Sequence, residues 1–235
     1  MTRSLRAGVI AIAAIAIGVG LAGCGSDTKT EPSTSKQTST ASSTATSSSA
    51  APIKTQPPQA AGSNKTIVDY IKENNITEAP VHRGDAGSPT IDLPSPPGWE
   101  DAGNRTPEWA YGAIVSSDPA MAQDPPTVIA LVSKLTGNVD PAKILEYAQG
   151  EIKNLPGFDG AQGGQPSTLA GFDATQIGGT YTKDGVKRAI AQKTVAIPGQ
   201  DALYVLQLNA DGTEDQMGAL MDATGVIDEQ TTITP

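Results

Sequence analysis

Residues 172–208 read FDATQIGGTYTKDGVKRAIAQKTVAIPGQDALYVLQL, and this stretch decides the fold. It holds three runs rich in the β-branched and aromatic residues that favour strands, at 172–181, 186–197 and 202–208. Lys183-Asp184-Gly185 separates the first two runs, and Asp-Gly supplies the positive φ that a type I′ hairpin turn needs. Ile197-Pro198-Gly199-Gln200 forms the next turn. The stretch therefore predicts an antiparallel meander of three strands.

Helices are predicted on both sides of this meander. Asp140-Pro141 is typical of a helix start, with Asp as the N-cap and Pro at the first helical position. Pro156-Gly157 ends that helix, whose apolar stripe consists of Ile144, Leu145, Ala148, Ile152 and Leu155. Thr213-Glu214-Asp215-Gln216 is a capping box that opens a second helix. The buried face of the second helix is expected to be Met217, Leu220, Met221 and Thr224.

The chain before residue 140 predicts a short helix and several strands. Ile67, Val68 and Ile71 fall at helical spacing before Asn74-Asn75, a plausible stop. Strands are predicted at 89–94, 108–117 and 126–135, with a turn at Pro96-Pro97-Gly98-Trp99. Adjacent hairpins together with few helices predict an α+β fold, in which helices pack against an antiparallel sheet.

The N-terminus predicts export. Arg3 and Arg6 precede an uncharged apolar run that is shorter than the about 20 residues needed to cross a membrane. The only cysteine, Cys24, directly follows Leu21-Ala22-Gly23. This arrangement resembles the bacterial lipoprotein signal, in which residues 1–23 are removed, the cysteine is diacylated and the new amine is usually acylated. Two or more acyl chains anchor a protein stably. The alternative is an ordinary secretory signal followed by an idle thiol.

Residues 24–63 form a low-complexity segment of Ser, Thr, Ala and Pro. The segment has almost no large apolar residues, so we expect a disordered tether, and about 38 flexible residues span roughly 30–40 Å root-mean-square. Its Ser and Thr clusters beside Pro either carry O-linked sugar or form a bare spacer. One globular domain, 64–235, follows, with enough apolar residues to bury a core without disulfides or metal.

The charge of the chain excludes several partners. It carries 16 Lys and Arg against 25 Asp and Glu, and five of the basic and two of the acidic residues precede residue 64. The remaining 11 basic and 23 acidic residues give the domain a formal charge of −12. A body this acidic repels phosphate backbones and anionic lipid surfaces. We therefore expect no nucleic-acid partner, and we expect the acyl groups on Cys24 to hold the chain at the membrane.

The order of these features resembles a known family. A lipidated N-terminus and a Ser/Thr-rich tether precede a strand with Leu93-Pro94-Ser95-Pro96-Pro97-Gly98-Trp99. A long helix follows Asp140-Pro141, and the Lys183-Asp184-Gly185 hairpin leads to the C-terminal helix. Together they resemble the mycobacterial LpqN/LpqT lipoproteins. The resemblance implies a PsbP-like α/β/α sandwich with helices on both faces of the sheet. It also implies an exported envelope protein without known enzyme chemistry, with trehalose-linked mycolate lipids and their transporters as ligand and partner classes.

Groups that carry catalysis or bind metals are few. His82, the only histidine, lies in a turn-rich segment, and the chain has no Gly-x-Ser-x-Gly motif. A single histidine excludes zinc sites built from two or three histidines, so we expect no metal and no cofactor. Residues 209–215, NADGTED, hint at a calcium-binding EF-hand loop but lack its bidentate Glu at position twelve. We expect that segment to be a turn between a strand and the capped helix.

Four aromatic residues are the candidates for binding a ligand: Trp99, Trp109, Tyr111 and Tyr181. Apolar tails and sugar faces both bind well to aromatic rings, and this chain has only two Trp and two Phe. The alternative is that these side chains pack the protein core, where aromatic residues are usually found.

These observations lead to three functional hypotheses. The preferred one is a non-catalytic lipoprotein, anchored on the extracytoplasmic side of the cell membrane or partly released to the surface or medium. It binds an envelope glycolipid of the trehalose-mycolate class and assists its transport or the assembly of the envelope. The second is a protein–protein interaction module that engages a transporter or a host protein. The third is a hydrolase that depends on His82.

Overall fold

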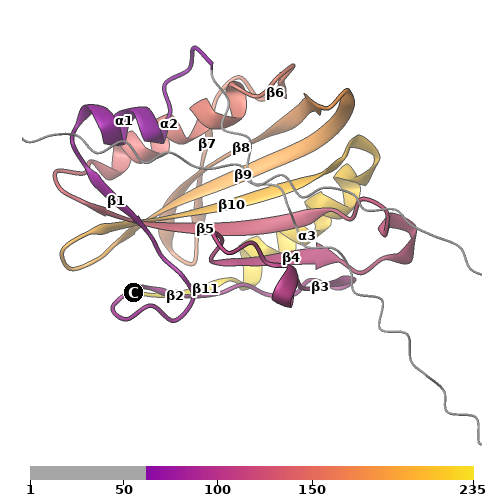
Figure 1. Cartoon of the computed structure of the whole chain (residues 1–235), viewed down its shortest axis with the longest axis horizontal. Helices are drawn as coiled ribbons and strands as arrows, with labels where there is room; N and C mark the ends of the chain where they lie inside the picture. The colour runs from indigo at the N-terminus through magenta and orange to yellow at the C-terminus, as the bar shows by residue number, and fades with distance from the viewer. Residues whose placement is uncertain (1–61) are drawn as a thin grey trace, which may run out of the picture. The chain divides into compact units, whose positions relative to one another are not determined.

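The computed structural model describes residues 62–235. The signal sequence predicted at 1–23 and nearly all of the tether predicted at 24–63 lie outside the described residues. Figure 1 shows the elements in their order along the chain: α1 (Ile67–Glu73), β1 (Thr77–Pro80), β2 (Thr90–Asp92), β3 (Trp99–Asp101), η1 (Gly103–Arg105), β4 (Gly112–Ser116), η2 (Pro119–Met121), β5 (Thr127–Thr136), α2 (Pro141–Lys153), β6 (Asp159–Gly160), β7 (Gln165–Leu169), β8 (Phe172–Lys183), β9 (Val186–Pro198), β10 (Leu203–Thr213), η3 (Glu214–Gln216), α3 (Met217–Gln230) and β11 (Thr232–Thr234).

A large antiparallel sheet forms the centre of the domain. Within residues 62–235 it contains nine strands in the order β3-β4-β5-β10-β9-β8-β6, with β1 paired to β5 and β7 paired to β8. The long strands β5, β10, β9 and β8 run side by side through its middle (Figure 1). The predicted α+β class is thereby confirmed.

The predicted meander is confirmed together with its turns. Lys183 lies opposite Val186 across the hairpin between β8 and β9. Asp184 and Gly185 have φ values of 51° and 79°, the left-handed conformation that a type I′ turn requires at both central positions. Between β9 and β10, the Gly199 N–H donates to the Ala202 carbonyl at 2.9 Å. Two tight turns therefore fix the pairing of all three strands.

Both predicted helix starts are also confirmed. The side chain of Asp140 accepts a hydrogen bond from the Ala142 N–H at 2.9 Å, which satisfies one free donor at the start of α2. The Thr213 N–H donates to Oε1 of Gln216 at 2.9 Å, as a capping box requires.

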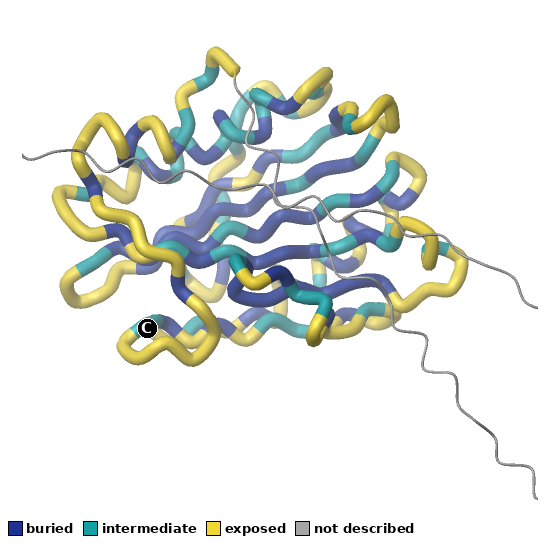
Figure 2. Tube along the Cα trace, viewed as in Figure 1, coloured by how far each residue is buried: buried dark blue, intermediate teal, exposed yellow. Residues whose placement is uncertain are grey.

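Helices cover both faces of the sheet, as the sandwich prediction required. Successive residues of a strand point to opposite faces, and β10 shows the consequence. Leu203 and Val205 pack in the core under α1 and α2, whereas Leu206 and Leu208 pack in the core under α3. Figure 2 shows the buried residues concentrated along the central strands between these layers.

Several segments differ from the predictions, and the short strands β1 and β3 were not predicted. The strand predicted at 108–117 is shorter, because the Ala110 N–H donates to the Pro107 carbonyl at 2.9 Å and forms a turn before β4. The turn predicted at 209–215 is wrong for residues 209–213. Strand β10 continues to Thr213, since Ala210 and Asp211 pair with both β5 and β9. Strand β11 was not predicted: Ile233 lies opposite Ile91 of β2 in a separate two-stranded ribbon.

Candidate ligand-binding groove beside helix α3

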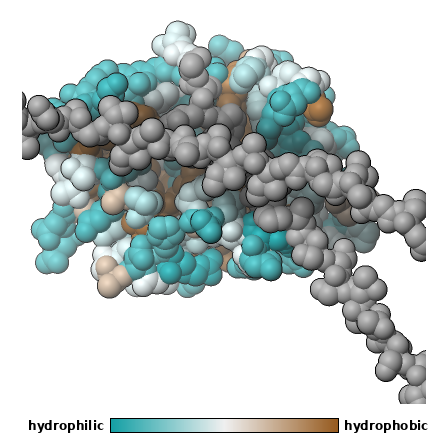
Figure 3. All heavy atoms as spheres, in the orientation of Figure 1, coloured by the Kyte–Doolittle hydropathy of each residue, from teal (hydrophilic) through white to brown (hydrophobic). Residues whose placement is uncertain are grey.

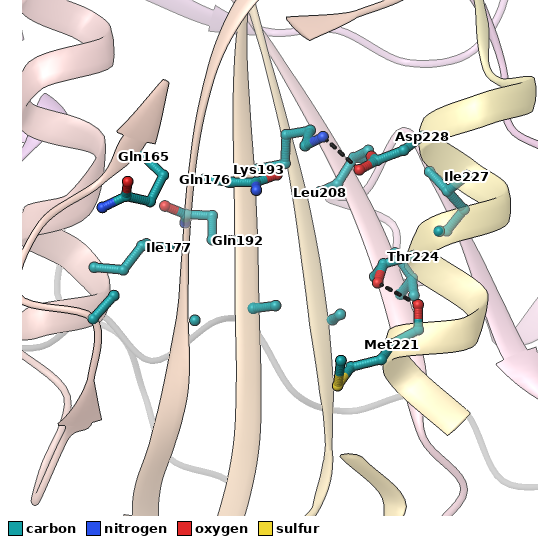
Figure 4. A pocket seen from close by; sticks show the side chains of 16 residues that line it. Gln165, Gln176, Ile177, Gln192, Lys193, Leu208, Met221, Thr224, Ile227 and Asp228 are labelled. Carbon is teal, nitrogen blue, oxygen red and sulfur yellow. Dashed lines mark hydrogen bonds and ion pairs between the residues drawn. The ribbon is translucent and has the colours of Figure 1, made fainter. Parts of the chain in front are cut away.

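A hollow on the α3 face of the sheet lies over strands β8 and β9, beside α3. Its volume is about 380 Å³, which lies within the range of roughly 300–1,000 Å³ for small-molecule sites. A second hollow of about 220 Å³ continues it toward the N-terminal end of α3, and the two share Gly178, Ala191, Met221 and Thr224. We call the two hollows together the α3 groove. Figure 4 shows the side chains that line its larger part.

Small residues form the floor of the α3 groove. Directly paired residues of neighbouring strands point to the same face of a sheet, so strand pairing arranges them in rows across it. Two neighbouring rows are made almost entirely of small residues: Gly178, Ala191 and Ala210 in the first, and Thr180, Ala189 and Gly212 in the second. Four of them line the groove: Gly178, Ala189, Ala191 and Ala210. A Cβ on Gly178 would lie 3.6 Å from the Cβ of Ala191. Since these side chains are short, the space above β8 and β9 stays open.

Helix α3 forms one wall of the groove and corrects a prediction. Leu220, Ala223 and Ile227 are the buried residues of this helix. Met221 was predicted to be buried, but 67% of it is exposed and it lines the groove instead. Met217 lies one turn before Met221 and lines the smaller hollow.

The other end of the groove is polar. Gln165, Gln176 and Lys193 are paired in a row across β7, β8 and β9. The Nζ of Lys193 lies 2.7 Å from Oδ2 of Asp228 on α3, an ion pair that Figure 4 shows at the edge of the hollow. Only 9% of the Lys193 side chain is exposed, against 40% for Asp228. The groove therefore combines apolar walls with a small group of hydrogen-bonding side chains.

The structure gives two of the predicted aromatic residues internal hydrogen bonds. Tyr111 is 4% exposed, and its hydroxyl accepts a hydrogen bond from the Ile91 N–H at 3.0 Å. Tyr181 is 1% exposed and donates to Oδ2 of Asp211 at 2.7 Å. Burial and this acidic neighbour raise the pKa of Tyr181 well above its ordinary value. The hydroxyls of both residues are thus already occupied inside the protein.

The two tryptophans are half-buried and lie against different clusters. Trp99 packs against the large core under α3, and Trp109 packs against a smaller cluster around Ala110 and Ile129. None of the four aromatic candidates lines the α3 groove. Their role in ligand binding stays a prediction, and none of the residues that line the groove was predicted from the sequence as a binding residue.

A partly buried ionic network lies beside Tyr181 at the end of the central strands. Nε of Arg188 donates to Oδ1 of Asp211 at 2.8 Å, and its Nη1 donates to Oδ2 of Asp124 at 2.5 Å. This guanidinium is 11% exposed and holds two carboxylates from separate segments together. The network therefore ties the loop before β5 to strands β9 and β10.

Another polar cluster lies under α2. Oε2 of Glu151 accepts hydrogen bonds from Nε2 of Gln207 at 2.9 Å and from Nε2 of Gln192 at 3.4 Å. Burial raises the pKa of the Glu151 carboxyl above its ordinary value, although the two amides act in the opposite direction. Oε1 of Gln192 has no hydrogen-bond partner among the described residues.

The remaining candidates for chemistry are dispersed. Nδ1 of His82 lies 3.6 Å from Oδ2 of Asp85 in an exposed turn where both side chains are half exposed. Within residues 62–235, no group of three or more His, Cys, Asp or Glu side chains is placed to hold a metal ion. The same residues contain no helix long and apolar enough to cross a membrane. Hydrophilic residues cover most of the surface of this domain that is visible in Figure 3.

Comparison with known proteins gives the family. The sequence profile described as "Probable lipoprotein LpqN" matches residues 63–234. The chain belongs to the LpqN lipoprotein family. It is 59% identical over 179 residues to Lipoprotein LpqN of Mycobacterium tuberculosis (strain ATCC 25618 / H37Rv), an alignment that covers 75% of this chain and 77% of that protein. Both descriptions name lipoproteins, which agrees with the expected membrane association.

A solved structure supports the fold of this LpqN-family chain. The present structure is similar to the crystal structure of LpqN, which is described as involved in cell envelope biogenesis of Mycobacterium tuberculosis. The TM-score is 0.70 and the sequence identity is 58%. The match covers 74% of this chain and 100% of that one. Since the crystallised relative matches only this share, the corresponding part of the present chain, residues 62–235, is expected to fold without its N-terminal segment.

Proposed function

We propose that this chain is a non-catalytic lipoprotein that binds an envelope glycolipid of the trehalose-mycolate class in the α3 groove. In binding it, the chain assists the transport of the lipid or the assembly of the cell envelope. The observation that carries the proposal is the α3 groove itself, an open trough whose floor is small residues and whose far end is an ion pair. Apolar walls with a few polar groups are the usual lining of a small-molecule site and suit an amphiphile.

Membership of the LpqN family supports the cell envelope as the place where this function is carried out. The solved relative is described as involved in cell envelope biogenesis, and a glycolipid of the envelope is a ligand that fits such a process. In this proposal the chain is anchored to the membrane by acyl groups on Cys24. The sequence Leu21-Ala22-Gly23-Cys24 marks that cysteine, and residues 1–23 are the signal that is removed. Residues 24–63 act as the tether that carries the domain on the extracytoplasmic side of the membrane.

The proposal also holds that the chain has no catalytic role. The exposed His82 lies beside Asp85 in a turn and is not among the residues that line the α3 groove. An acyl chain bound in the groove therefore meets small and apolar residues instead of a nucleophile activated by a base.

Thermal unfolding of residues 62–235 in the presence of trehalose 6-decanoate tests the proposal. A ligand that binds only the folded state stabilises it by RT ln(1 + [L]/Kd), about 2.7 kcal/mol at a hundredfold excess over Kd. Ala191→Phe places a ring in the groove above the floor, and this variant is expected to lose the ligand-dependent rise in melting temperature. Val186→Phe is the matched control, because Val186 lies on the same strand at the exposed hairpin, with 49% of it exposed. Equal shifts in all three proteins, or none in the wild type, would contradict the proposal.

A protein partner is the alternative, and the charge of the domain is the observation that favours it. With a formal charge of −12, residues 64–235 suit a transporter or host protein with a basic surface. Such an interaction is expected to weaken steeply with salt and to survive Ala191→Phe. Binding that depends on the groove is expected to change little with salt.

A further inference from the structure

The α3 groove has two chemically different ends, and this inference rests on the glycolipid-binding function proposed above. We propose that the ligand lies in one fixed direction, with an uncharged, hydroxyl-rich head at Lys193 and its acyl chain running toward Met217. Two independent walls, the sheet and the helix, carry the same polarity gradient. Beyond the glycolipid class already proposed, the proposal assigns the orientation of the ligand and the residues that hold its head.

The floor changes from polar to apolar along the strands. The row at the polar end contains Gln165, Gln176 and Lys193. The next row, two residues further along each strand and so about 7 Å away, contains Gly178 and Ala191. The row after that, about 13 Å from the polar row, contains Thr180 and Ala189. An acyl chain that lies along the strands thus meets short side chains once it has passed Lys193.

The helix wall changes in the same direction. Met217 and Met221 line the groove beside the small residues of the floor, and Asp228 lines it beside Lys193. At 1.5 Å per residue, Met217 and Asp228 are about 16 Å apart along the helix. The smaller hollow, at the Met217 end, is lined by no charged residue. Thr224, midway along this wall, already donates its hydroxyl to the Leu220 carbonyl at 2.9 Å.

Lys193 leaves hydrogen bonds for a head group. Its ammonium group has three donors, and within residues 62–235 its recorded polar contact is the ion pair with Asp228. The side chain is more than nine-tenths buried at the end of the groove. Asp228 occupies one side of the ammonium group, so a ligand oxygen at this place can accept a hydrogen bond from its remaining donors. The exposed amide of Gln176, next to Lys193 in the row, adds one acceptor and two donors.

The charges around this end favour an uncharged head. Asp228 already neutralises Lys193, and the whole domain carries a formal charge of −12. A phosphate or carboxylate would have to compete with Asp228 for Lys193 and enter a negative field. Sugar hydroxyls both donate and accept, so they can bind Lys193, Asp228 and Gln176 without breaking the ion pair.

Binding of three probes with the same tail tests the head-group class on residues 62–235. The probes are dodecyl maltoside, dodecyl phosphate and 1-dodecanol, titrated as monomers by calorimetry. Dodecyl maltoside is expected to bind at least tenfold more tightly than dodecyl phosphate. Equal or tighter binding of the phosphate would overturn the uncharged head. Binding of none of the three would overturn the proposed function as well, so the two failures can be told apart.

Matched variants test which residues hold the head. Lys193→Met and Gln176→Leu are each expected to weaken the binding of dodecyl maltoside at least tenfold. The affinity for 1-dodecanol, which has no sugar head, is expected to stay unchanged. Lys187→Met is the control, since Lys187 lies on the same strand, is half exposed and pairs with Glu214 outside the groove. An equal loss for the maltoside and the alcohol in both variants would overturn the assignment, because it would show that the residues shape the groove without contacting the head.

Direction is tested by a crystal structure with 12-bromododecyl maltoside and anomalous scattering from the bromine. We expect the bromine to lie beside Met217 and Ala189 and the sugar to lie beside Lys193. A bromine beside Lys193 would overturn the orientation while leaving the α3 groove as the binding site.

Discussion

Replacing Gly150 by Ala tests how closely α2 packs against the chain that precedes α1. A Cβ at Gly150 would lie 2.0 Å from the carbonyl oxygen of Lys65 and 2.8 Å from its carbonyl carbon. Both distances are far below van der Waals contact, and both atoms belong to the backbone. The neighbouring residue Asn64 is held by hydrogen bonds to Asn154 in both directions, at 3.0 Å and 2.8 Å. The Lys65 backbone therefore cannot move aside without breaking these bonds.

Two effects of opposite sign decide the magnitude. Ala is favoured over Gly in a helix interior by about 1 kcal/mol. Overpacking a tight contact costs about 1–3 kcal/mol, and because the contact here is with fixed backbone the upper part of this range, about 2–3 kcal/mol, applies. We therefore expect Gly150→Ala to lower the free energy of unfolding by about 1–2 kcal/mol, a fall of roughly 2–8 °C in melting temperature for a domain of this size.

Gly225→Ala is the matched control for helix propensity. Gly225 lies inside α3, and a Cβ there would meet no atom within 4 Å. This variant is expected to gain up to about 1 kcal/mol. Urea unfolding of residues 62–235, followed by tryptophan fluorescence, measures both variants. If Gly150→Ala is as stable as the wild type, the close packing of α2 on Lys65 is refuted.

Three further predictions concern titration, capping and anchoring. The pKa of Glu151 is raised in the folded state, so ionising this carboxyl destabilises the fold. As the pH rises above 4.5, the ordinary pKa, the wild type should therefore lose stability relative to Glu151→Gln, until the folded carboxyl has ionised. Urea unfolding at a series of pH values measures this difference, and a difference independent of pH contradicts it. Thr213→Ala should lower stability by about 1 kcal/mol in the same assay, since it removes half of the capping box; an unchanged midpoint would show that the cap contributes nothing. Cys24→Ala should release the chain from the membrane or leave its signal uncleaved, and unchanged membrane fractionation would refute the lipid anchor.

The local elements of the fold could be predicted because local rules decide them. The Asp184-Gly185 turn adopts the conformation that its residues favour, and the caps at Asp140 and Thr213 form as their side chains require. The limits of strands were harder to predict. Polar residues at 209–213 suggested a turn, but pairing with strands on both sides keeps them in β10. Tertiary contacts there override the local preference.

The candidate site was missed for a different reason. Helical spacing placed Met221 on the buried face of α3, but the small floor leaves nothing for that side chain to pack against. The necessary signal was present in the hairpin, because a turn at Asp184-Gly185 puts Gly178 opposite Ala191. The pairing of Ala191 with Ala210 extends the same row across β10. The scarcity of aromatic residues instead indicated Tyr111 and Tyr181, but the hydroxyls of both make hydrogen bonds inside the core.

The central claim, that the α3 groove holds the acyl chain of an envelope glycolipid, is tested most directly in the cell. The full-length chain and its Ala191→Phe variant are purified from their own membranes, and the lipid bound to each is identified by mass spectrometry. We predict a glycolipid bound in about equimolar amount to the wild type and strongly depleted in Ala191→Phe. Detection of the same lipid in equal amount on both proteins, or of no lipid on the wild type, would contradict the claim.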